Sequence, residues 1–108
     1  KSASKGLSVT LSQGGTSGTK FIVSGSNSTD TSNYEFYYRI EDSSPTSIAL
    51  NATKTSLGLS LAVSNPATGV DNVTVATGKY IVVYECEKTS GIIKAYGSAE
   101  VKEGAIKK

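Results

Sequence analysis

Histidine, tryptophan and methionine are absent from this sequence, and cysteine occurs once, at Cys86. Without histidine, the chain lacks the usual base for a serine or cysteine nucleophile. A single cysteine excludes an internal disulfide bond, and the absence of tryptophan removes the best side chain for stacking on sugar rings. Because a primary translation product begins with methionine, we expect a processed chain or, preferably, a domain excised from a larger protein.

Charge and length suit one small domain. The 108 residues carry a net charge of +2, and the lysines are scattered along the chain. Nucleic-acid binding requires basic residues clustered on one face, and a membrane-spanning helix requires about 18 apolar residues in a row. We therefore expect no nucleic acid, no membrane insertion and no cofactor. Residues 1–108 are expected to form a single domain, with a core between about 6 and 103.

Alternation of apolar and polar residues is the dominant pattern, and serine and threonine make up about a quarter of the chain. In the segment after Asn33, Phe36 and Tyr38 point to one side, and Tyr37 and Arg39 to the other. Glycine, proline and asparagine separate such segments. The expected strands lie at residues 6–11, 19–25, 33–42, 47–51, 57–63, 70–76, 78–88 and 92–101. This pattern predicts an all-β fold, an antiparallel two-sheet sandwich of seven to nine strands.

Residues 78–88, GKYIVVYECEK, hold the cysteine within a regular strand. Glu85 and Glu87 indicate that their face is exposed. By alternation, the inner face holds Tyr80, Val82, Tyr84 and Cys86. We expect Cys86 to be a buried structural residue, because a reactive thiol requires a cationic or histidine neighbour. A two-residue turn at Ser90 and Gly91 would place Cys86 opposite Ala95.

Residues 76–82, ATGKYIV, are similar to a stretch of immunoglobulin-like domains in which a glycine or alanine precedes a tyrosine by two positions and a cysteine follows it by two. Gly78 and Tyr80 match, Val82 stands in place of the cysteine, and Ala76 replaces the usual acidic residue. The resemblance implies an immunoglobulin-like sandwich in which Tyr80 is the corner tyrosine that bonds to the connecting loop. Without the disulfide, it points to immunoglobulin-like and fibronectin-like modules of bacterial surface-layer proteins, adhesins and phage virion proteins.

Catalytic and metal sites are not expected. Glu85 and Glu87 invite a glycosidase interpretation, but glycosidase carboxyls flank a cleft about 5–10 Å apart, and two carboxyls on one flat strand flank nothing. Asp30, Asp42 and Asp71 lack the alternating spacing of a calcium-binding loop and are typical of turns.

The outer face of the hairpin formed by residues 78–101 is the candidate interface. By alternation Ile81, Val83 and Tyr96 point outward, and Tyr37 and Arg39 join them if their strand lies alongside. Tyrosine and arginine are enriched at interfaces, and contiguous exposed apolar patches usually contact a partner. Alternatively, these residues only stabilise the sheet through cross-strand pairs.

Two functions are consistent with these observations. The first is a non-enzymatic structural or binding module of an extracellular cell-surface or virion protein, acting as a spacer, lattice or adhesion unit beside neighbouring domains or subunits. The second is a carbohydrate-binding module that contacts a cell-wall or host glycan. N-glycosylation sequons occur at Asn27, Asn51 and Asn72, a number expected by chance in a chain rich in serine and threonine.

Overall fold

The structure is a computed structural model that describes residues 3–108. Seven strands and one short 3-10 helix follow one another along it. They are β1 (Leu7–Gln13), β2 (Thr19–Gly25), β3 (Tyr34–Glu41), β4 (Leu61–Ala62), β5 (Val70–Val73), β6 (Tyr80–Glu87), β7 (Ile93–Glu100) and η1 (Glu103–Ala105). The strands form a three-stranded sheet, β1-β2-β5, and a four-stranded sheet, β4-β3-β6-β7, with antiparallel pairing throughout. The predicted all-β, two-sheet sandwich is confirmed.

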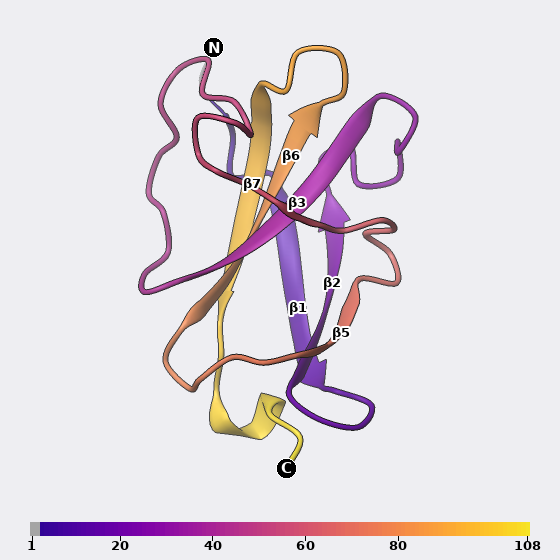
Figure 1. The fold of residues 1–108 in the computed structure, drawn as a ribbon, viewed down its shortest axis with the longest axis vertical. Helices are drawn as coiled ribbons and strands as arrows, with labels where there is room; N and C mark the ends of the chain where they lie inside the picture. The colour runs from indigo at the N-terminus through magenta and orange to yellow at the C-terminus, as the bar shows by residue number, and fades with distance from the viewer. Residues whose placement is uncertain (1–2) are drawn as a thin grey trace.

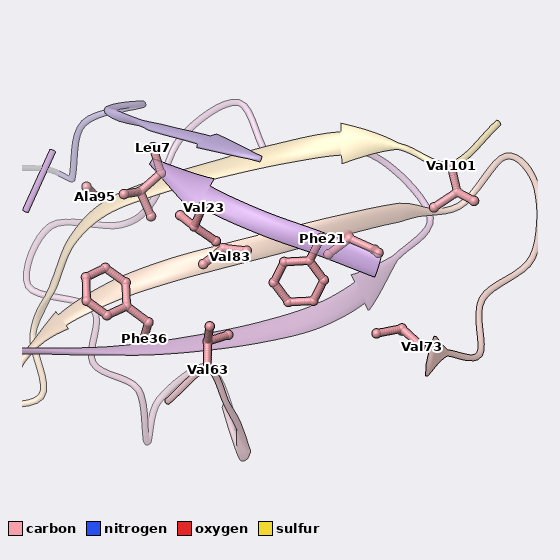
Figure 2. Close-up of a cluster of buried hydrophobic side chains, with 10 residues drawn as sticks. Leu7, Phe21, Val23, Phe36, Val63, Val73, Val83, Ala95 and Val101 are labelled. Carbon is pink, nitrogen blue, oxygen red and sulfur yellow. The ribbon is translucent and has the colours of Figure 1, made fainter. Parts of the chain in front are cut away.

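The main core lies between the two sheets (Figure 2). The ring of Phe21 from β2 meets the ring of Tyr38 from β3 edge-on, with the ring centroids 5.0 Å apart. Alternation on β1 and β3 places their apolar residues inside, as predicted. The fully or largely buried members of this core are Leu7, Phe21, Val23, Phe36, Val63, Val73, Ile81, Val83, Ala95 and Val101.

Strand β6 is buried on both faces, and the predicted orientation of its side chains is wrong. Ile81 and Val83 point into the main core, whereas Val82, Tyr84 and Cys86 point to the outer side of the four-stranded sheet. That outer side is covered by residues 42–60, which have no regular strand and cross in front of the sheet (Figure 1). We call residues 42–60 the covering segment.

A second hydrophobic cluster fills the space beneath the covering segment. Its buried members are Ile48, Val82, Tyr84, Cys86, Ile93 and Tyr96. Ala52, Leu57 and Leu59 of the covering segment pack against them. The predicted strand at 47–51 is therefore absent, and the predicted strand at 57–63 is reduced to Leu61–Ala62. Alternation predicted one common face for the apolar residues from Leu57 to Val63. Instead, Leu57 and Leu59 pack in this cluster, Leu61 is exposed and Val63 lies in the main core.

The hairpin of β6 and β7 is offset by one residue from the predicted register. Val83 lies opposite Gly97 and Glu85 opposite Ala95, and a bulge follows Glu85. Residues 88–91 form the turn, closed by a hydrogen bond from the Gly91 N–H to the Glu87 carbonyl. This turn has four residues instead of the predicted two, which moves the register by two, and the bulge moves it back by one. Large residues of β6 still lie opposite small residues of β7, as Val83 does with Gly97, but these pairs lie on the side of the main core.

Within residues 3–108, no helix is long and apolar enough to cross a bilayer.

Candidate functional site

The predicted interface does not form one exposed surface. Ile81 and Val83 are completely buried in the main core. Tyr96 is buried on the opposite face of the sheet, beneath the covering segment. Tyr37 and Arg39 share that outer face but are half-buried. The outer face that holds Tyr37, Arg39 and Tyr96 is therefore not solvated as alternation predicted, because the covering segment packs over it.

Arg39 links the sheet to the covering segment. Its Nη1 donates a hydrogen bond to the carbonyl oxygen of Leu57, and its Nε lies 3.1 Å from Oε2 of Glu41. Its Nη2 donates to the hydroxyl of Tyr84, which in turn donates to the carboxylate of Glu41. Burial, followed by the hydrogen bond to Glu41, raises the pKa of Tyr84 well above its ordinary value. The phenol therefore stays neutral and acts as a structural donor at physiological pH.

Lys54, three residues before Leu57, makes a second link between the covering segment and the sheet. Its Nζ lies 2.6 Å from Oε2 of Glu35 and 3.3 Å from the Tyr37 hydroxyl, and it sits over the Tyr37 ring at 5.4 Å from the centroid. The hydrogen bond from Lys54 lowers the pKa of the Glu35 carboxyl. Backbone bonds from Lys54 N–H to the Gly91 carbonyl and from Ile93 N–H to the Ala52 carbonyl continue the attachment. The side chains of Tyr37 and Arg39 thus make contacts within the domain.

Cys86 is completely buried in the second cluster. It lies opposite Ile93 rather than Ala95. Burial raises the pKa of its thiol to about 12, so the thiolate is scarce at neutral pH. Its position is that of a small core residue.

The other residues of the immunoglobulin-like motif differ in their roles. Gly78 adopts φ of +91°, a conformation that favours glycine, and its N–H donates to the Val101 carbonyl. Among the residues that the structure describes, the Tyr80 hydroxyl has no hydrogen-bond partner, so the corner-tyrosine assignment is wrong; its side chain packs against the second cluster. On β6, the tyrosine hydroxyl that bonds to other side chains is that of Tyr84. Val82, at the position of the missing cysteine, is completely buried in that cluster.

Glu85 is the residue that the sequence interpretation misplaced most. Its carboxylate is completely buried and accepts hydrogen bonds from the backbone N–H of Asn27 at 2.9 Å, from Asn27 Nδ2 at 3.2 Å and from Ser26 Oγ at 3.2 Å. These donors belong to the turn between β2 and β3, so Glu85 fastens that turn to β6. No spacing in the sequence reveals this partnership.

The aspartates considered as calcium ligands lie in separate places. Asp30 caps its own turn by accepting bonds from Asn33, and Asp42 pairs with Lys79. Asp71 accepts a hydrogen bond from the Gly15 N–H at 3.0 Å. In residues 3–108 no group of three or more acidic, histidine or cysteine side chains is placed to hold a metal ion.

Both chain ends are fastened by backbone hydrogen bonds. Ser4 pairs in parallel with β7: its N–H donates to the Lys94 carbonyl at 3.1 Å, and the Tyr96 N–H donates to the Ser4 carbonyl at 2.9 Å. After β7, Lys107 pairs with Gly18, with bonds of 3.2 Å and 2.8 Å in the two directions. The two attachments lie at opposite ends of the long axis of the molecule, whose extents are 40 × 26 × 21 Å (Figure 1).

The family model of the S-layer protein SbsC C-terminal domain matches residues 8–104, from β1 to beyond β7. The chain belongs to this family. The sequence resemblance to surface-layer modules is thereby confirmed, and with it an extracellular, cell-surface location.

Two solved structures of SbsC share the fold. The crystal structure of domains 7, 8 and 9 superposes with a TM-score of 0.66 at 20% identity, covering 96% of this chain and 30% of that chain. A structure of domains 4–9 gives a TM-score of 0.63 at 20% identity, covering 96% of this chain and 15% of that one. This chain therefore spans less than a third of either structure. The comparison with curated proteins found no match.

The three sequons of this SbsC-family domain differ in their surroundings. The side-chain amide of Asn27 donates to Glu85, and Oδ1 of Asn72 accepts the N–H groups of Thr16 and Ser17. Asn51 is exposed.

Proposed function

We propose that this domain is a non-enzymatic spacer in a surface-layer protein, joined end to end with neighbouring domains. The observation that carries the proposal is the position of its ends: Ser4 and Lys107 are held at opposite ends of the longest axis. A chain that enters at one end and leaves at the other extends a row by the full length of the domain. Ends that lay side by side would fold the row back on itself.

The coverage of the related structures supports the same proposal. This domain corresponds to about a third of a structure of three SbsC domains and about a seventh of a structure of six. Its outer surfaces suit a spacer, because the covering segment closes one sheet face and leaves a single compact unit. Neighbouring domains or subunits are therefore the partners we propose, and the domain itself carries no catalytic role.

The spacing of domains tests this proposal. Segments of the parent protein that contain this domain alone, with one neighbour and with two neighbours would be compared by small-angle X-ray scattering. The maximum dimension is expected to grow by close to the 40 Å length of the domain with each neighbour added. Growth by only the 21–26 Å of the shorter axes would show side-by-side packing and contradict the proposal.

A hollow with aromatic residues in its lining allows a glycan-binding role to be tested. A hollow beside β4 is lined by Tyr34 and Tyr37 together with Glu35, Lys88 and Phe36, which is buried in the main core. Aromatic faces with a few polar groups are the usual elements of sugar sites. Titration of the domain with cell-wall oligosaccharides, followed by amide chemical shifts, would move the signals of these residues if a glycan binds here. Unchanged shifts at millimolar ligand would exclude this site.

A further inference from the structure

Each end of the chain is fastened to the sheet to which its own strand does not belong. Ser4 leads into β1 of the three-stranded sheet, yet its hydrogen bonds go to β7 of the four-stranded sheet. Lys107 follows β7, yet its hydrogen bonds go to Gly18, directly before β2 of the three-stranded sheet. Tension applied to either end therefore reaches both sheets at once.

The attachment of Ser4 lies along the direction of such tension. Ser4 and β7 run in parallel, and β7 continues toward the other end of the molecule. When the chain ends are pulled apart, these two segments are drawn past each other lengthwise. The bonds from Ser4 N–H to Lys94 and from Tyr96 N–H to Ser4 are transverse to that movement and are loaded together rather than in succession.

The attachment of Lys107, at the opposite end, is also loaded lengthwise when the chain ends are pulled apart. The pairing with Gly18 is antiparallel, so the chain leaves the molecule while Gly18 leads inward to β2. Two backbone bonds join these residues, and the Thr19 hydroxyl adds a bond of 2.8 Å to the Ala105 carbonyl. Thr19 is completely buried, which keeps this bond away from competing water.

Close packing of β1 against β7 extends the first attachment. A Cβ atom built on Gly97 would lie 2.2 Å from the carbonyl oxygen of Leu7, so only glycine permits this approach. Leu7 itself is buried in the main core. Sliding the first segment along β7 would therefore also disturb core packing at Leu7.

We propose that the domain is a force-bearing link, in which the Ser4 and Lys107 attachments act as two shear-loaded clamps that resist stretching between the chain ends. This inference rests on the proposed end-to-end arrangement, because only there does tension in the row pass through both ends. Bonds loaded together must break together, so the rate of unfolding under force is low in this direction. The same bonds pulled from one side open one at a time.

Single-molecule stretching of the chain in two directions tests the clamps without altering them. In the first geometry, handles are attached to the two chain ends. In the second, one handle is attached to the N-terminus and the other to the thiol introduced by Thr89→Cys. Thr89 is an exposed residue in the turn before β7. The second geometry unzips the Ser4 segment from β7, and its rupture force is expected to be lower by at least about twofold, because forced unfolding follows the barrier in the direction of pulling. Equal forces in the two directions would overturn the proposal.

Paired variants identify the bonds responsible. Ser4→Pro removes the N–H that donates to Lys94, and Lys107→Pro removes the N–H that donates to Gly18. Each is expected to lower the end-to-end rupture force, whereas Ser4→Ala and Lys107→Ala, which keep the N–H, leave it unchanged. Equal forces for the proline and alanine variants would contradict the assignment.

The clamp and the end-to-end proposal can fail separately. Direction-dependent rupture is a property of this domain alone, whereas the growth in maximum dimension measured by scattering depends on its neighbours. A domain with direction-independent rupture in an extended row would refute only the clamps.

Discussion

Glu85 provides the sharpest contrast between this structure and a reading of the sequence by alternation, which places Glu85 and Glu87 together in solvent. In the structure Glu85 is completely buried and holds the turn at Ser26 and Asn27. Glu87, two residues further along the same strand, is part-exposed, and its carboxylate accepts a hydrogen bond from the Ser90 hydroxyl in its own turn. The substitutions Glu85→Ala and Glu87→Ala should therefore differ strongly in their effect on stability.

The magnitude follows from the three hydrogen bonds to Glu85. The bond from the Asn27 N–H to the buried, charged carboxylate contributes about 1.5–3 kcal/mol, as is typical of a hydrogen bond to a charged group. The bonds from Asn27 Nδ2 and Ser26 Oγ come from a part-exposed turn that water can reach, and each adds about 0.5 kcal/mol. Glu85→Ala should thus lower the free energy of unfolding by about 3 kcal/mol, and Glu87→Ala by about 0.5 kcal/mol or less.

Urea denaturation followed by tyrosine fluorescence or circular dichroism would measure both values. In thermal melts the Glu85→Ala loss corresponds to a decrease in Tm of more than about 10 °C for a domain of this size. Glu85→Gln should give an intermediate loss, because the Asn27 amide can turn to accept from the new side chain. Equal losses below about 1 kcal/mol for Glu85→Ala and Glu87→Ala would refute the buried position of Glu85.

Three further predictions concern the second cluster and its polar links. The Cys86 thiol should react slowly with a thiol reagent in the native domain and quickly in denaturant, because burial raises its pKa to about 12; equal rates would show that it is exposed. Tyr84→Phe should cost about 1–3 kcal/mol through lost hydrogen bonds, and Tyr80→Phe about 0.5 kcal/mol or less; a reversed order in urea denaturation would restore Tyr80 as the corner tyrosine. Because the folded-state pKa of Glu35 is lowered by Lys54, its contribution to stability is present above the ordinary carboxyl pKa and is lost as the pH falls through the lowered one. The stability difference between the parent and Glu35→Gln should therefore shrink between about pH 5 and pH 2, and a constant difference would contradict the link to Lys54.

Alternation predicted the strands that have one buried and one polar face. In β1, for example, Leu7 enters the core while Ser8 and Thr10 are exposed, so the period of two identifies both the strand and its inner side. Both sheets and the all-β class follow from segments of this kind. The motif around Gly78 and Tyr80 pointed to surface-layer, adhesin or phage virion modules, and the family match decided for the first, even though Tyr80 does not have the hydrogen bond that the motif implies.

The same rule fails on β6 because both of its faces are interior. A strand without a wet face has no periodicity from which to read its orientation, and the two glutamates were the only remaining markers. Glu85 is misleading as a marker, because its acceptors are satisfied by donors about 60 residues away in sequence. The wrong placement of Ile81 and Val83 in the predicted interface follows from this error, whereas Tyr37, Arg39 and Tyr96 lie on the outer face as predicted and are covered by residues 42–60.

The covering segment and the chain ends could not be derived from the sequence for a different reason. Leu57 and Leu59 alternate as in a strand, but they pack on the sheet from irregular backbone, and Leu50 of the same segment is exposed. The bonds of Ser4 and Lys107 are made by backbone groups, which every residue except proline can supply. Such contacts depend on where the chain passes in space, and no residue type indicates them.

The most direct test of an end-to-end spacer is a structure of this domain together with the domain that follows it in the parent protein. The account predicts that the two long axes continue one another and that the bonds between Gly18 and Lys107 persist at the joint. Two domains folded back along their sheet faces, or a joint in which Lys107 has left Gly18, would contradict it.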